Sequence, residues 1–247
     1  MTEFTGLAAV VTGGSSGIGL ATARLLNERG AEVAVLDIAR SPDESVTFIE
    51  CDVRDESSVR TAISQTYETF AHLDVLVNNV GRGVQGTITD HDDDEWHQAL
   101  DLNVVSIARV TRSALPFLRA SEHAAIVNTC SSAAVVGLRN RAVYSATKGA
   151  VLALTLAMAA DFVADSIRVN CVNPGTVDTP WIQELLSAAD DPEVELRALV
   201  ARQPIGRLVR PAEVANAIAY LASPFSASTT GTVLNVDGGL QTLRVPL

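Results

Sequence analysis

Residues 7–19 read Leu7-Ala-Ala-Val-Val-Thr-Gly-Gly-Ser-Ser-Gly-Ile-Gly19, an apolar run that ends in a glycine-rich turn. A helix-periodic stretch follows over residues 20–29 and ends at Gly30, a residue type that commonly closes helices. Glycines let a backbone approach a phosphate closely, and a helix N-terminus supplies N–H donors. The stretch therefore predicts a phosphate-binding loop, although its spacing, Gly13-x3-Gly17-x-Gly19, is not the common G-x-G-x-x-G. The alternative is a tight turn that binds nothing.

Apolar stretches of strand length alternate with helical stretches along the whole chain. The expected strands cover residues 7–12, 32–36, 46–50, 73–77, 124–128, 167–172 and 232–236. The expected helices cover residues 20–29, a stretch from Asp55 or Ser57 to about 71, 96–119 with a possible break near Asp101, 142–163, two short segments within 180–201, and 211–222. This order predicts one α/β domain over residues 1–247, with a Rossmann-type, doubly wound parallel sheet of about seven strands and a small helical lid at about residues 180–210.

The composition suits a large core and an acidic surface. Apolar residues make up 47% of the 247 residues, and the mean hydropathy is +0.23. The formal net charge of −11 argues against nucleic acid or an anionic membrane as a partner held by bulk charge. An anionic small molecule bound by a few placed arginines remains compatible with it.

Cysteines and apolar segments indicate the compartment. Cys51, Cys130 and Cys171 lie in apolar runs without metal-ligand spacing, which suggests buried free thiols in a reducing cytosol. The N-terminal stretch is unlike a signal peptide, and the most apolar helical stretch, around residues 150–160, is expected to be too short and too interrupted to span a bilayer. We therefore expect a soluble cytoplasmic protein.

The second expected strand ends at Asp37, about 20 residues after the glycines. An acidic side chain at this position suits the 2′-hydroxyl of a ribose and repels a 2′-phosphate. Arg40 could bind a phosphate instead, but the glycine loop itself contains no basic residue. The sequence therefore favours NAD over NADP.

Lys148 is the only lysine in the chain, whereas all the other basic residues that count toward the charge are arginines. Tyr144, one of three tyrosines, lies four residues earlier, so on a helix the two side chains share a face. A neighbouring ammonium favours the phenolate form, which would let Tyr144 act as an acid–base group near neutral pH. A chance or surface pair is the alternative.

Several polar residues follow expected strands. Asp37, Asn78, Ser131 and Asn173 do so and should gather at one edge of the sheet, where such folds bind ligands. Asn103 lies within an apolar helical stretch, where an unpaired amide is costly, so it either caps a kink or has a function.

The run His91-Asp-Asp-Asp-Glu95 reads as the solvated start of a helix rather than a metal site. Carboxylates are favoured at a helix N-terminus, and His91 and His97 are not at an i, i+4 spacing. We expect no metal.

With these residues in place, the sequence resembles the short-chain dehydrogenase/reductase family over nearly its whole length. The shared motifs are Thr12-Gly-Gly-Ser-Ser-Gly-Ile-Gly19, Asn78-Asn-Val-Gly81, Tyr144-x-x-x-Lys148 and Pro174-Gly175, in the family's order and spacing. Val80 departs from the family's usual alanine.

The resemblance implies Asn103, Ser131, Tyr144 and Lys148 as catalytic residues, with Ser131 preferred over Ser132 by its spacing from Tyr144. Ser131 would hold the substrate oxygen, Tyr144 would take its proton, Lys148 would assist Tyr144 and bind the nicotinamide ribose, and Asn103 would hold a water in the proton relay. The implied NAD-binding residues are Gly13, Ser15, Ser16, Gly17, Ile18, Gly19, Asp37, Asp52, Val53, Asn79, Gly81, Tyr144, Lys148, Pro174, Gly175, Val177 and Thr179.

A closer likeness, around Tyr144, Pro174 and Gln203, is to type 2 3-hydroxybutyrate dehydrogenases and 2-keto-3-deoxy-L-fuconate dehydrogenases, which act on carboxylates. It implies that Arg141 and Arg202 bind a substrate carboxylate, with Ser131, Tyr144 and Trp181 also at the substrate. Alternatively, the arginines lie on the surface or at a subunit contact, and Trp181 only anchors the lid.

The resemblance thus implies an NAD-dependent dehydrogenase of a small hydroxy acid or sugar acid, working as a homotetramer. The alternatives are a dehydrogenase of a neutral sugar, alcohol or cyclic diol and, more remotely, a non-catalytic nucleotide-sensing protein.

Overall fold

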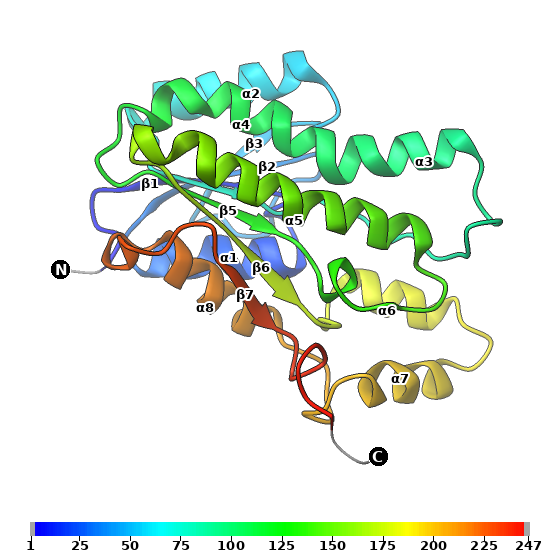
Figure 1. Ribbon diagram of the computed structural model, residues 1–247. Coiled ribbons are helices and arrows are strands. Elements are labelled where there is room, and N and C mark those ends of the chain that lie inside the picture. Colours follow the sequence, from blue (N-terminus) through cyan, green and yellow to red (C-terminus); the bar gives the residue numbers. More distant parts are fainter. Residues whose placement is uncertain (1–2, 245–247) are drawn as a thin grey trace.

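The computed structural model describes residues 3–244, so the ends of the expected 1–247 domain lie outside the described part. These residues form one α/β domain around a seven-stranded, all-parallel sheet of order β3-β2-β1-β4-β5-β6-β7 (Figure 1). The strands are β1 Ala8–Thr12, β2 Glu32–Asp37, β3 Thr47–Glu50, β4 Val75–Asn78, β5 Ala125–Thr129, β6 Arg168–Pro174 and β7 Val233–Val236. The predicted fold class is confirmed, with strand ends displaced by one or two residues.

Helices cover both faces of the sheet. Figure 1 shows α2 Glu56–Phe70, α4 Ser106–Leu118 and α5 Ala142–Phe162 over one face, with α1 Gly17–Glu28 and α8 Pro211–Ala222 over the other. Each face has its own cluster of buried aliphatic side chains, because the strands are buried on both sides. The remaining helices are α3 Asp93–Leu100, α6 Pro180–Ser187 and α7 Pro192–Ala201. The last two lie past the carboxyl ends of β6 and β7, where a lid is expected.

The long helix expected over residues 96–119 is broken, as the sequence suggests. A π-helical turn over Asp101–Val105 separates α3 from α4 and contains the buried Asn103. The acidic run before it is a helix start: the Asp92 carboxylate accepts the Glu95 N–H, and the Glu95 carboxylate accepts the Asp92 N–H. For α2 the cap is Asp55 rather than Ser57, since the Asp55 carboxylate accepts the N–H groups of Ser57 and Ser58.

The apolar stretch around residues 150–160 belongs to a longer helix than expected. Helix α5 and the turn after it, Ala142–Asp165, are long and apolar enough to cross a membrane by length and composition, with a mean hydropathy of 1.5. The expectation that this segment is too short is therefore wrong, because the helix continues beyond residues 150–160 in both directions. In this fold α5 packs along β6. The three cysteines are buried and free, as predicted.

Candidate active site

A cavity of about 500 Å³ lies at the carboxyl edge of the sheet. Most of the predicted site residues line it, although they come from separate parts of the chain. They are Gly13, Ser16, Gly17, Ile18, Asp37, Asp52, Val53, Asn79, Gly81, Ser131, Arg141, Tyr144, Lys148, Pro174, Gly175, Val177, Thr179, Trp181 and Arg202. Ser15, Gly19 and Asn103 are predicted site residues that do not line it. The topology explains the gathering, because parallel strands all end at this edge.

The glycine loop forms one end of the cavity. Helix α1 begins at Gly17, inside the glycine motif and three residues earlier than expected, and its first turn has no side-chain cap at Ser16. A Cβ on Gly19 would lie 2.1 Å from the Gly13 carbonyl oxygen. Gly19 therefore lets the two ends of the glycine turn pack closely together, although it does not line the cavity itself. Uncapped amides at a helix N-terminus beside a cavity are what a bound pyrophosphate requires.

Asp37 lies at the end of β2, on the same cavity. Its carboxylate accepts the N–H of Ser15 at 3.0 Å and the N–H of Ala39 at 3.2 Å. Ser15 therefore orients Asp37 by its backbone, and its hydroxyl donates to the Ala39 carbonyl at 2.6 Å. The carboxylate is thus held at the position expected for a ribose-binding acid.

Beyond Asp37 the cavity is lined by both apolar and charged residues. Ile38, which is 69% exposed, and Val53 both line it. Asp52 lies beside them, and its hydrogen bonds from the Arg54 guanidinium lower the pKa of its carboxyl group. Ile38 was not among the predicted residues; a large apolar side chain directly after a strand-end acid is the signal that could have indicated it.

Lys148 and Tyr144 lie one turn apart on α5 at the middle of the cavity. The Lys148 side chain is almost fully buried, and its ammonium donates to the Thr129 carbonyl at 2.8 Å. The Nζ atom lies 5.9 Å from the centroid of the Tyr144 ring. Gly81 leaves room for this ammonium, since a Cβ there would lie 3.2 Å from Nζ. The spacing that suggested a shared helix face is confirmed.

Ser131 lies at the end of β5 and lines the same cavity. Its hydroxyl oxygen accepts the Ala133 N–H at 3.2 Å, which leaves the hydroxyl proton available for a ligand. Ser132 also lines the cavity, so the structure does not by itself separate the two serines.

The Asn103 side-chain amide is hydrogen-bonded within the protein through both of its N–H groups and its oxygen. Its Oδ1 accepts the Arg82 N–H at 2.8 Å, and its Nδ2 donates to the Arg82 carbonyl at 3.0 Å and to Thr147 Oγ1 at 3.1 Å. The side chain therefore ties the β4 loop to α5 next to Lys148. Thr147 was not predicted as a site residue, because no sequence motif marks it as a partner of Asn103.

Arg141 is buried, with only 8% of its surface exposed, and it lines the cavity together with Arg202. Its one side-chain hydrogen bond goes to the carbonyl of its neighbour Asn140, and among residues 3–244 neither arginine forms an ion pair. Burial lowers the pKa of Arg141, and the nearby Arg202 guanidinium lowers it further. The interpretation of Arg141 as a surface residue is therefore wrong.

Trp181, on the first turn of α6, reaches across the cavity to the loop after β4. A Cβ on Gly83 would lie 2.4 Å from Cζ2 of the indole, so the indole edge rests on Gly83. Gly83 also lines the cavity and was not predicted. The contact closes the cavity between the lid and the β4 loop.

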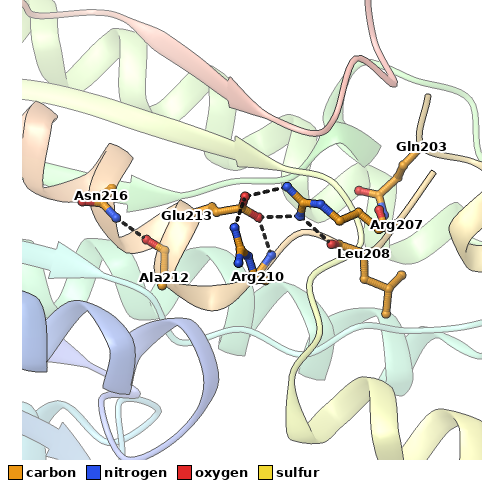
Figure 2. A network of polar contacts seen from close by, with 7 residues as sticks. All are labelled: Gln203, Arg207, Leu208, Arg210, Ala212, Glu213 and Asn216. Carbon is orange, nitrogen blue, oxygen red and sulfur yellow. Dashed lines mark hydrogen bonds and ion pairs between the residues drawn. The ribbon is translucent and has the colours of Figure 1, made fainter. Parts of the chain in front are cut away.

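Polar contacts anchor the end of the lid to α8 (Figure 2). The Gln203 amide donates to the Arg207 carbonyl at 3.0 Å, and the Arg207 guanidinium donates to both Glu213 carboxylate oxygens at 2.8 and 2.7 Å. The Arg210 N–H adds a further bond to Glu213 at 2.8 Å. This network fixes the backbone directly after Arg202.

Comparisons with known proteins agree with this geometry. A family model described as enoyl-(acyl carrier protein) reductase matches residues 13–241. The Rattus norvegicus dehydrogenase/reductase SDR family member 6 is 41% identical over 97% of this chain and 99% of its own. The cis-4-hydroxycyclohexanecarboxylate dehydrogenase of Sinomonas cyclohexanicum is 40% identical over 94% and 95% of the two chains. The L-fucose dehydrogenase of Bos taurus is 37% identical over 97% and 91%.

Solved structures extend the likeness. The ligand-free aldohexose dehydrogenase of Thermoplasma acidophilum matches with a TM-score of 0.93 and 31% identity, over 100% of this chain and 99% of that one. With motifs, fold and relatives in agreement, the chain belongs to the short-chain dehydrogenase/reductase family and is an oxidoreductase that passes hydride between an alcohol or ketone carbon and a nicotinamide.

Proposed function

We propose that this enzyme is an NAD-dependent dehydrogenase whose substrate is a small hydroxy acid or sugar acid. The observation that carries the proposal is the buried Arg141, which lines the cavity beside Arg202 and forms no ion pair among residues 3–244, with Glu195 close enough to act on its charge but beyond ion-pair distance. A buried cation is costly unless it is paired, and two adjacent guanidiniums raise that cost. A substrate carboxylate bound between them would remove it and would fix the hydroxyl near Tyr144.

The geometry around Tyr144 supports the following catalytic roles. The Ser131 hydroxyl, whose proton is free, donates to the substrate oxygen, while Tyr144 takes the hydroxyl proton as general base. The Lys148 ammonium, fixed by the Thr129 carbonyl, stabilises the resulting negative charge on Tyr144 and binds the nicotinamide ribose. Asn103 positions these groups, since its side-chain amide ties the loop after β4 to Thr147, and it would also hold a water of the proton relay.

The proposed cofactor is NAD, which when bound accepts the hydride at its nicotinamide ring. The α1 N-terminus and the glycine loop would hold its pyrophosphate, and Asp37 would bind the adenosine ribose. The Asp37 carboxylate would repel a 2′-phosphate, and no basic residue in the glycine loop would compensate.

Among the relatives, one is named for a cyclic hydroxy acid, and this supports the proposal. Others are named for the neutral sugars fucose and aldohexose, so a neutral substrate is the second candidate. The acid and neutral candidate substrates differ in the carboxylate group. Two ring alcohols, one with and one without a carboxylate, can therefore distinguish them.

The test measures the rate of NADH formation with cis-4-hydroxycyclohexanecarboxylate and with 4-methylcyclohexanol, beside 3-hydroxybutyrate, sugar acids and free sugars, each with NAD and with NADP. We expect turnover of acids with NAD. Replacing Arg141 with Gln should then raise the KM for acids by about tenfold or more, since a charge-assisted hydrogen bond is worth about 1.5–3 kcal/mol. Turnover of neutral compounds alone would reject the acid substrate while leaving the catalytic residues in place.

We also propose a homotetramer located in the cytoplasm. The side of α5 away from the sheet is apolar and open, with Leu156 47% exposed and small residues at Ala153 and Ala157 that permit close helix approach. Light scattering of the purified protein tests the assembly; a monomer at micromolar concentration would reject it.

A further inference from the structure

A second cavity of about 570 Å³ lies against the first. Arg141 and Arg202 line both cavities, so these two residues form the common wall. We call the first the inner cavity and the second the outer cavity. The outer cavity is further lined by Arg139, Asp90 and Glu195. It lies between the loop after β4, the turn before α5, and α7.

The outer cavity gathers three arginines in an acidic protein. Arg139, Arg141 and Arg202 supply three guanidiniums, whereas Asp90 and Glu195 supply two carboxylates. His91, also on this cavity, has its Nδ1 3.3 Å from the Glu95 carboxylate. Asp90 already accepts the N–H and the hydroxyl of Thr87, both at 2.7 Å. If Glu95 is counted through its contact with His91, the carboxylates equal the guanidiniums in number, whereas the whole chain carries −11.

Arg139 stands apart from the other two arginines. It is exposed and, within residues 3–244, it forms neither an ion pair nor a side-chain hydrogen bond. Its turn is nevertheless fixed, because the Gly86 N–H donates to the Asn140 carbonyl at 3.0 Å and the Ala142 N–H donates to the Gly86 carbonyl at 3.2 Å. A free guanidinium is thus held on a rigid turn at the edge of the outer cavity.

One contact narrows the inner cavity on its lid side. The Trp181 indole rests on Gly83 and joins the lid to the β4 loop. Bound NAD would fill the groove from the glycine loop to Lys148. Arg141 and Arg202 form the boundary of the inner cavity that faces the outer cavity.

We propose that the outer cavity is the entry route for the anionic substrate and that Arg139 attracts the substrate before Arg141 and Arg202 bind its carboxylate. The inference rests on the proposed acid substrate. Arg139 does not touch the bound substrate and acts through the local potential, so it affects substrate capture and not the chemical step.

The experiment compares Arg139→Gln, Arg139→Lys and the control Arg60→Gln, with saturating NAD and cis-4-hydroxycyclohexanecarboxylate or 3-hydroxybutyrate as probe. Arg60 is an exposed arginine of α2 that lines neither cavity, so its replacement changes the net charge equally. At low ionic strength we expect Arg139→Gln to lower kcat/KM about threefold with kcat unchanged, and Arg139→Lys to retain the wild-type value. The difference should vanish at about 0.5 M salt, where the screening length is only a few ångströms.

Equal kcat/KM values for Arg139→Gln and Arg60→Gln at low salt, with the acid still turned over by the wild type, would overturn the entry route alone. A loss that persists at high salt would also overturn it, because it would indicate contact rather than attraction. A wild type that oxidises 4-methylcyclohexanol but neither acid would instead reject the proposed substrate, and the entry route with it. Thermal unfolding of each variant serves as the control for an intact fold.

Discussion

The Lys148 ammonium lies 5.9 Å from the centroid of the Tyr144 ring, and the Thr129 carbonyl holds it there through a 2.8 Å hydrogen bond. Burial of the ammonium restricts its solvation, so its charge acts mainly on the few groups around it. Tyr144 is the one tyrosine among these groups. We therefore expect Tyr144 to transfer the proton in the proposed reaction.

Replacing Tyr144 with Phe should lower kcat by about 10²–10⁴-fold, because the variant loses the proton acceptor and keeps the ring. The melting temperature should stay close to the wild-type value, since among residues 3–244 the hydrogen bond of Tyr144 outside the helix ladder involves its main-chain carbonyl and not its hydroxyl. Steady-state kinetics and calorimetry measure these quantities. Tyr220→Phe, at an exposed position on α8, is the matched control. Wild-type kcat in Tyr144→Phe would assign the proton transfer elsewhere.

Replacing Asp37 with Asn should reduce the preference for NAD over NADP by about 10- to 100-fold in kcat/KM. The amide keeps the shape of the side chain and one acceptor for the N–H groups of Ser15 and Ala39, but it loses the charge that repels a 2′-phosphate. Kinetics with each cofactor measure the ratio. Asp161→Asn, at an exposed position on α5, removes one carboxylate without touching the cavity. An unchanged ratio would mean that Asp37 does not select the cofactor.

Much of this site could be predicted from the sequence, because its residues lie next to strand ends. In a parallel sheet the order of strands and helices alone brings Asp37, Ser131 and Pro174 to one edge. The shared face of Tyr144 and Lys148 needs only the helical repeat.

Other features depend on packing between distant segments. Gly83 could not be identified, because its importance comes from the Trp181 indole that rests on it from another part of the chain. The sequence also did not decide whether Arg141 lies in the cavity or on the surface. The burial of an arginine at a helix start depends on how the lid packs against it. The outer cavity forms where three segments that are distant in the sequence come together, so the sequence alone does not reveal it.

Replacing Gly19 with Ala should abolish NAD binding and lower the melting temperature. A Cβ at this position would lie 2.1 Å from the Gly13 carbonyl oxygen and 2.6 Å from the Asn79 side chain, and a backbone atom cannot move aside without opening the loop. Isothermal titration with NAD and thermal unfolding measure both effects. Gly137→Ala, where the added methyl meets nothing within 4 Å, should leave both unchanged. Normal NAD affinity in Gly19→Ala would show that the loop tolerates expansion.

Replacing Glu213 with Gln should lower the melting temperature at pH 7 by about 2–4 °C, as expected when a networked ion pair is lost from a domain of this size. The Arg207 guanidinium, with help from the Arg210 N–H, holds the pKa of Glu213 well below its ordinary value (Figure 2). A carboxyl group whose pKa is lower in the folded state stabilises the fold above its unfolded pKa, about 4.3 here, and loses this effect as the pH falls.

The difference in melting temperature between wild type and Glu213→Gln should therefore be constant above about pH 5 and shrink progressively below about pH 4. Calorimetric scans from pH 7 down to pH 3 measure it. Glu184→Gln, at an exposed carboxylate on α6 that forms no ion pair within residues 3–244, should show little difference at any pH. A difference that stays constant down to pH 3 would mean that Glu213 stabilises the lid anchor through packing or neutral hydrogen bonds rather than through its charge.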